Sequence, residues 1–146
     1  MNSILTITFV FICDFLTKFL VTKSMTYGAT TKITPFFNIV HVKNLGVSFS
    51  LLYNNHKLGP WILGLISIFI TFFVIHLLRK TSNVKSKIAL AAVIGGALGN
   101  LFDRFKFGGV IDFLDFHVLQ YHWPAFNIAD IAIVLGLGVY WFRERK

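Results

Sequence analysis

Residues 58–78, LGPWILGLISIFITFFVIHLL, decide the fold class of this chain. The run is long enough to cross the hydrocarbon core of a bilayer, and its only titratable side chain is that of His76. Hydrophobic residues make up 55% of the 146 residues and charged residues only 14%, against about 25% in a typical soluble domain. With a mean hydropathy of +0.71, the chain is expected to be an integral membrane protein.

Three further apolar stretches resemble membrane spans. They cover residues 3–22, 86–102 and 125–142. The first has neither the basic start nor the small-residue cleavage site of a removable signal peptide, so we expect a retained helix. The predicted fold is an all-α membrane protein, in which four transmembrane helices form a single domain over residues 1–146.

The basic residues predict the orientation of these spans. Arg79, Lys80, Lys85 and Lys87 lie between the second and third spans, and the tail at 143–146 is also basic. Lys and Arg concentrate on the cytoplasmic side, so both termini are expected in the cytoplasm and segments 23–57 and 105–124 outside, although lysines in 23–57 weaken the contrast. The net charge of +8 is then explained by topology and membrane lipid rather than by a nucleic-acid partner.

The outer segment 23–57 is too polar for a span and too long for a turn. Its stretch Ile39–Lys43 alternates apolar and polar residues, which predicts short β-strands in a small extracytoplasmic cradle. Segment 105–124 contains Tyr121, His122 and Trp123, which are typical of the aromatic belt at a membrane interface.

Five of the six acidic residues lie in or beside predicted spans, where a charge is costly. Asp14 is expected to pair with Lys18 one helical turn away. Asp103 closes the third span within reach of solvent, and Asp115 is expected to be solvated. The sixth acid, Glu144, is expected to be a solvated partner in the basic tail.

Asp112 and Asp130 are the candidate catalytic residues. Each lies in an apolar stretch at the outer side of a span, so both are expected at a similar depth. Two nearby carboxylates in a low-dielectric site share a proton, as in aspartic proteases. Spacing alone leaves a catalytic pair as one hypothesis among several, because their proximity is inferred only from topology.

Other chemistries have little support in the sequence. The single cysteine, Cys13, excludes thiol-disulfide oxidation by a cysteine pair. H-E-x-x-H and G-x-S-x-G motifs are absent, and the five histidines are scattered. The glycines at 95 and 99 are better explained by close helix contact than by a phosphate-binding loop.

Five segments in order resemble bacterial lipoprotein signal peptidase, signal peptidase II. They are Asp14–Lys18 (DFLTK), Asn44–Ser50 (NLGVSFS), Gly95–Arg104 (GGALGNLFDR), Gly109–Phe113 (GVIDF) and Phe126–Asp130 (FNIAD). Ser48 stands where the family pattern usually has Ala, a change of one small residue for another. The resemblance covers nearly the whole chain.

The resemblance implies an intramembrane aspartic endopeptidase with Asp112 and Asp130 as its dyad. It would cleave prolipoproteins before their diacylglyceryl-modified cysteine, as a monomer, without metal or organic cofactor. It also implies substrate-binding or supporting roles for eight residues: Asn44, Gly46, Asn100, Arg104, Asn127, Asp14, Lys18 and Asp103. Two alternatives remain open from the residues themselves, a small proton-coupled transporter and a structural membrane subunit.

Overall fold

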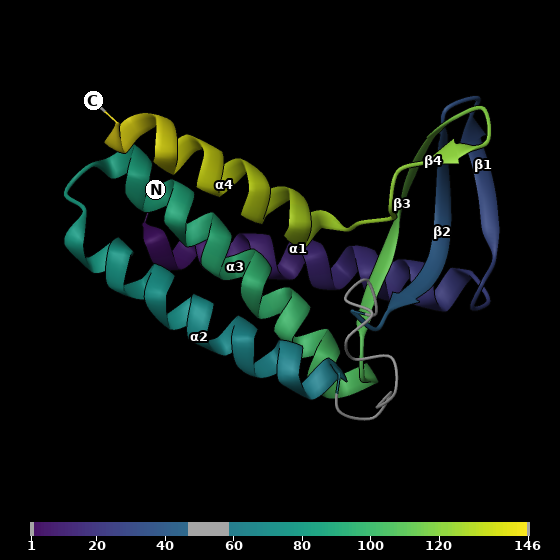
Figure 1. The fold of residues 1–146 in the computed structure, drawn as a ribbon, viewed down its shortest axis with the longest axis horizontal. Coiled ribbons are helices and arrows are strands. Elements are labelled where there is room, and N and C mark those ends of the chain that lie inside the picture. Colours follow the sequence, from purple (N-terminus) through teal and green to yellow (C-terminus); the bar gives the residue numbers. More distant parts are fainter. Residues whose placement is uncertain (1, 47–58, 146) are drawn as a thin grey trace.

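The computed structural model describes residues 2–46 and 59–145 (Figure 1). In chain order the elements are α1 (Ser3–Ser24), β1 (Thr30–Thr34), β2 (Phe37–Asn44), α2 (Gly59–Lys80), α3 (Val84–Phe107), β3 (Val110–Val118), β4 (Tyr121–His122) and α4 (Ile128–Glu144). The start of the second predicted span at residue 58, the motif residues 47–50 with Ser48, and the rest of the outer segment to residue 57 lie outside the described residues.

The four helices coincide with the four predicted spans. Within the described residues, three helical stretches are long and apolar enough to cross a membrane: Ser3–Ser24, Trp61–Lys80 and Val84–Phe107. The fourth helix, α4, has 17 residues. The helix α3 extends past the predicted boundary at 102 to Phe107, where Gly108 caps it in the left-handed conformation with φ 67°.

The helix α3 is the centre of the bundle, and small residues on it allow the other helices to come close. A Cβ atom at Gly95 would lie 2.7 Å from the Ile7 carbonyl oxygen of α1, and one at Gly96 would lie 2.5 Å from the Ala129 carbonyl oxygen of α4. The expected role of this glycine run in helix contact is therefore confirmed. Leu90, Val93 and Ile94 of α3 form a buried core with Val74 of α2.

A four-stranded antiparallel sheet, in the order β1-β2-β3-β4, lies at one end of the bundle (Figure 1). Strands in segment 23–57 were predicted, and β1 and β2 confirm them. The sheet is larger than predicted, because segment 105–124 supplies β3 and β4 rather than an interfacial connection alone. Val110–Phe113 of β3 are buried in succession, so this strand lacks the alternation that identifies a half-exposed strand.

Both chain termini lie at the end of the bundle opposite the sheet, together with the α2–α3 connection (Figure 1). Here Glu144 is exposed, in agreement with the expectation of a solvated side chain. Its Oε1 accepts hydrogen bonds from Ser86 Oγ at 2.9 Å and Thr81 Oγ1 at 3.1 Å. These bonds tie the last turn of α4 to the start of α3, so α4 runs the length of the bundle.

Candidate active site

Asp112 lies on β3, where that strand crosses the end of the helical bundle. It is opposite Val42 of β2 in the sheet register, and its side chain is only 2% exposed. Asn127 Nδ2 donates a hydrogen bond to Asp112 Oδ1 at 2.7 Å. The carboxyl group is therefore withdrawn from bulk water and held by an amide from another element.

Asp130 lies in the first turn of α4, three residues after the helix cap Asn127. The two residues form a capping box: the Asp130 backbone N–H donates to Asn127 Oδ1 at 3.0 Å, and the Asn127 backbone N–H donates to Asp130 Oδ2 at 3.2 Å. Since the Asn127 amide also donates to Asp112, one residue contacts both acids. The expected proximity of Asp112 and Asp130 is present in the structure.

Asn100 of α3 connects this pair to the interior of the bundle. Its Nδ2 donates to Asp130 Oδ1 at 2.8 Å, while its Oδ1 accepts from Asn127 Nδ2 at 3.2 Å and from Lys18 Nζ at 2.9 Å. These partners fix the orientation of the Asn100 amide, because its oxygen faces two donors and its nitrogen faces a carboxylate.

The electrostatics of the site shift Asp112 towards its protonated form. Burial, and after it the negative charge of Asp130, raise the pKa of Asp112 from 3.8 to about 6, against the opposing effect of hydrogen bonds from Asn44 and Asn127. Asn44 is itself oriented by the Gly46 N–H, which donates to Asn44 Oδ1 at 2.8 Å. Gly46 has φ 74°, a conformation that favours glycine.

A buried cluster of three charged side chains lies next to the candidate acids. Lys18 Nζ forms ion pairs with Asp103 Oδ2 at 2.9 Å and with Asp14 Oδ2 at 2.6 Å. The predicted Asp14–Lys18 pair is confirmed. Asp103, expected near solvent, is instead 3% exposed, because α1 packs Lys18 against it.

The same cluster holds the two elements that carry the candidate acids. Asp103 Oδ2 accepts from the Ile111 N–H of β3 at 3.1 Å, next to Asp112. Asp14 Oδ1 accepts from the Ala129 N–H of α4 at 2.9 Å, next to Asp130. Asp14 and Asp103 therefore hold the backbone next to both candidate acids, and Lys18 joins the two carboxylates.

Arg104 lies in the last turn of α3, not beyond the helix as the predicted span end at 102 implied. Its Nη1 donates to the Asn100 carbonyl oxygen at 3.2 Å, and its guanidinium attracts Asp130 and Asp112 electrostatically. This is the one hydrogen bond of the guanidinium within the described residues, and a planar guanidinium has further N–H groups that can donate to a carbonyl group of a ligand.

A second polar cluster on the sheet was missed by the sequence reasoning. Asp115, expected to be solvated, is buried, and its carboxylate accepts from Asn38 Nδ2 at 2.8 Å and contacts His122 Nδ1 at 2.8 Å. Burial opposes ionisation, but these hydrogen bonds outweigh it and lower the pKa of Asp115.

One sequence signal could have identified Asn127 as the link between the candidate acids. Asp130 follows Asn127 by three residues, which is the spacing of a helix capping box.

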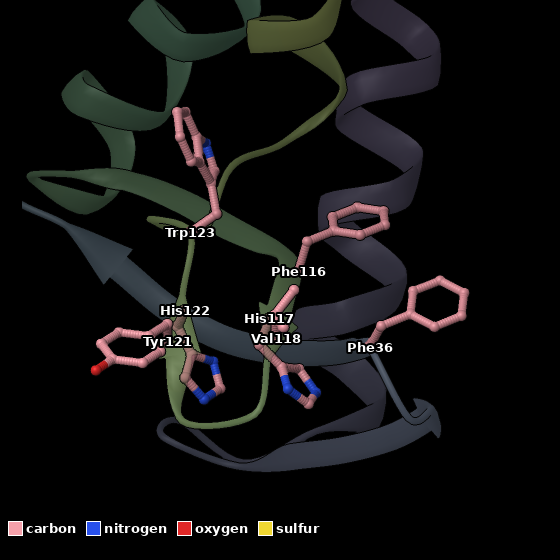
Figure 2. A pocket seen from close by; sticks show the side chains of 7 residues that line it. All are labelled: Phe36, Phe116, His117, Val118, Tyr121, His122 and Trp123. Carbon is pink, nitrogen blue, oxygen red and sulfur yellow. The ribbon is translucent and has the colours of Figure 1, made fainter.

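The pocket beside that cluster contains neither candidate acid. It has a volume of about 570 Å³ and is lined by Phe36, Phe116, His117, Val118, Tyr121, His122 and Trp123 (Figure 2). Most of its walls come from the β3–β4 hairpin and the residue that follows it, and Phe36 is added from the turn between β1 and β2. Within residues 2–46 and 59–145, no group of three His, Cys, Asp or Glu side chains is arranged to hold a metal ion.

Comparison with known proteins identifies the family. The sequence profile described as Signal peptidase (SPase) II matches residues 6–144. The chain belongs to the signal peptidase II family. Lipoprotein signal peptidases of Burkholderia thailandensis, Paraburkholderia phymatum and Burkholderia mallei are each 43% identical to it over 138 residues, covering 94% of this chain and 83% of theirs.

Two solved structures are similar to this fold, and both are described as bacterial membrane enzyme structures determined by the in meso method. The one at 1.9 Å resolution has a TM-score of 0.85 and 31% identity, covering 99% of this chain and 92% of that chain. The one at 2.3 Å has a TM-score of 0.83 and 30% identity, covering 97% and 86%. The chain is therefore a membrane peptidase that removes signal peptides from prolipoproteins, which excludes the transporter and structural-subunit alternatives.

Proposed function

We propose that Asp112 and Asp130 are the catalytic pair of an aspartic endopeptidase that cuts prolipoproteins immediately before the diacylglyceryl-modified cysteine. The observation that carries this proposal is Asn127, whose side chain and backbone N–H contact both acids. Aspartic proteases need two carboxyl groups that hold one proton between them. The raised pKa of Asp112, about 6, fits the protonated partner.

Asp130 is the partner that carries the negative charge. Its two oxygens accept N–H bonds from Asn100 and Asn127, and it lies in the first turn of α4, where the helix dipole favours an anion. A carboxylate held in this way is suited to act as the general base toward water.

The reaction then needs only water and the two acids. Asp130 takes a proton from water, the water oxygen attacks the scissile carbonyl carbon, and Asp112 gives its proton to the carbonyl oxygen. In the collapse of the tetrahedral intermediate, the C–N bond breaks and Asp130 passes its proton to the leaving nitrogen. One hydroxyl proton returns to Asp112, so the products are the signal peptide acid and an amino-terminal lipidated cysteine.

The remaining site residues divide into two groups. Asn44 at the end of β2 donates to Asp112, and Arg104 at the end of α3 attracts both acids, so we assign these two residues to contact with the substrate backbone. The second group bonds other groups of the protein, so we assign it to positioning. It consists of Asn100, Asn127 and the Asp14–Lys18–Asp103 cluster.

For the membrane, we propose a monomeric, single-domain chain with four spans in the bacterial inner membrane and both termini in the cytoplasm. The support for a spanning α4 is that Asn127 at its start bonds Asp112 beside the sheet, while Glu144 at its end bonds Ser86 at the opposite end of α3. The basic residues 79–87 and the basic tail lie at that same end, which agrees with a cytoplasmic location.

The test is cleavage of a purified diacylglyceryl-modified precursor by the purified enzyme in detergent. Asp112→Asn and Asp130→Asn should each reduce turnover to background without loss of folded protein, because Asn keeps the shape but cannot exchange the proton. Asp115→Asn, the same change three residues along β3, is the matched control and should retain activity. Wild-type turnover in either dyad variant would refute the assignment.

A further inference from the structure

An apolar groove begins at Asp130 and follows the first turns of α4 away from the sheet. It has a volume of about 540 Å³, and its walls include Trp123, Phe126, Asp130, Ile131, Val134 and Leu135. Trp123 contributes to its wall, and its ring points toward the helices, whereas Tyr121 and His122 point away from them (Figure 2). The groove thus connects a proposed catalytic carboxylate to a hydrocarbon-lined channel.

Within residues 2–46 and 59–145, the groove lies on a face of α4 that no other element covers. Ala129 and Gly136, on the opposite face, are buried against α3, where a Cβ at Gly136 would lie 2.6 Å from the Ala89 carbonyl oxygen. Val134 and Leu135 are 69% and 63% exposed. In a membrane-spanning helix such exposed apolar residues face lipid, so the groove is open to the acyl region along its side.

We propose that this groove receives one acyl chain of the substrate's diacylglyceryl group and thereby positions the modified cysteine beside the catalytic pair. The inference rests on the proposed function. The cysteine follows the scissile bond directly, so its lipid must pass from the level of Asp130 into the hydrocarbon core. The stretch from Asp130 to Leu135 runs in that direction for about 8 Å.

A hydrocarbon chain fits these walls better than an unwound stretch of signal peptide does. Near the scissile bond the peptide must be extended, and its backbone N–H and C=O groups then need partners in a medium without water. The walls at Ile131, Val134 and Leu135 offer no polar side chain, whereas an acyl chain needs none. Because bilayer lipid is as apolar as the groove, its contribution is expected in positioning rather than in affinity.

The test compares two synthetic lipopeptides of one peptide sequence in phosphatidylcholine nanodiscs. One carries two palmitoyl chains on its diacylglyceryl cysteine, and the other carries two butyryl chains, too short to reach Val134. Val134→Trp and Leu135→Trp fill the groove and should reduce kcat/KM for the palmitoyl substrate about tenfold or more. With the butyryl substrate the same variants should stay within about threefold of wild type.

Val139→Trp is the matched control, since Val139 is an exposed residue of the same helix outside the groove. It should leave both rates unchanged. Equal losses with both substrates, or no loss with either, would overturn the acyl-chain assignment while wild-type cleavage upholds the function. Failure of wild-type enzyme to cleave either lipopeptide would count against the proposed function itself.

Discussion

Replacing Lys18 by methionine removes the one cation of the buried cluster while keeping the length and apolar stem of the side chain. The Lys18 ammonium is 3% exposed and serves Asp14, Asp103 and the Asn100 amide oxygen. Its loss leaves two carboxylates in the bundle interior without an ion-pair partner among the described residues. Each still accepts one backbone N–H bond, from Ala129 and Ile111.

The magnitude follows from the cost of an uncompensated buried charge. Removing one partner of a buried ion pair destabilises a protein by about 3 to 5 kcal/mol. For a chain of 146 residues, this corresponds to a fall of roughly 10 to 15 °C in the unfolding midpoint. Activity should fall as well, because the two carboxylates hold the backbone beside Asp112 and Asp130.

The assay is thermal unfolding of purified protein in one detergent at fixed pH. Lys23→Met, the same change at an exposed position of α1, should lie within about 0.5 kcal/mol of wild type. The triple variant Asp14→Asn, Lys18→Met, Asp103→Asn removes all three charges and should recover much of the loss. A Lys18→Met protein that unfolds within two or three degrees of wild type would refute the reasoning.

Two other predictions concern stability. Because the pKa of Asp112 rises from 3.8 in the unfolded chain to about 6, the folded state binds more protons across that interval and stability falls as pH increases through it. Asp112→Asn should therefore be more stable than wild type above pH 6, by up to about 3 kcal/mol, and lose this advantage below pH 4 in denaturant titrations. Gly96→Ala should destabilise the protein and lower turnover, because the added Cβ pushes α3 away from the Ala129 carbonyl oxygen. Gly138→Ala, with open space at its Cβ, should be neutral or stabilising by up to about 1 kcal/mol. Equal unfolding midpoints for the two variants would contradict the packing argument.

The helices were predictable because their signal is local. The apolar run at 58–78 anticipates α2 (Gly59–Lys80) closely, since a membrane span must be a continuous helix. The strand β3 was missed because its residues 110–113 are buried on both faces, which removes the period-two pattern that a strand on a half-exposed sheet would show.

The candidate site was predictable only where residues are near in sequence or match the family pattern. Lys18 follows Asp14 by one helical turn, so that ion pair could be anticipated. Asp103 also contacts Lys18, but only because α1 packs on α3, and no local pattern reports that packing. The burial of Asp115 depends in the same way on the pairing of β2 with β3, which brings Asn38 to it.

The Asn100 amide connects the ion cluster to the candidate acids, and this connection gives the cluster a chemical role besides a structural one. Lys18 donates to Asn100 Oδ1, and Asn100 Nδ2 donates to Asp130 Oδ1. A cation on the oxygen of an amide polarises it and strengthens the hydrogen bond donated by its nitrogen. Lys18 therefore strengthens the hydrogen bond that Asn100 donates to Asp130. Its positive charge also acts on Asp112, whose pKa it lowers, whereas the negative charge of Asp130 raises that pKa. The ion cluster and Asp130 thus shift the protonation of Asp112 in opposite directions, so changing Lys18 changes the charge balance of the proposed catalytic pair as well as the packing around it.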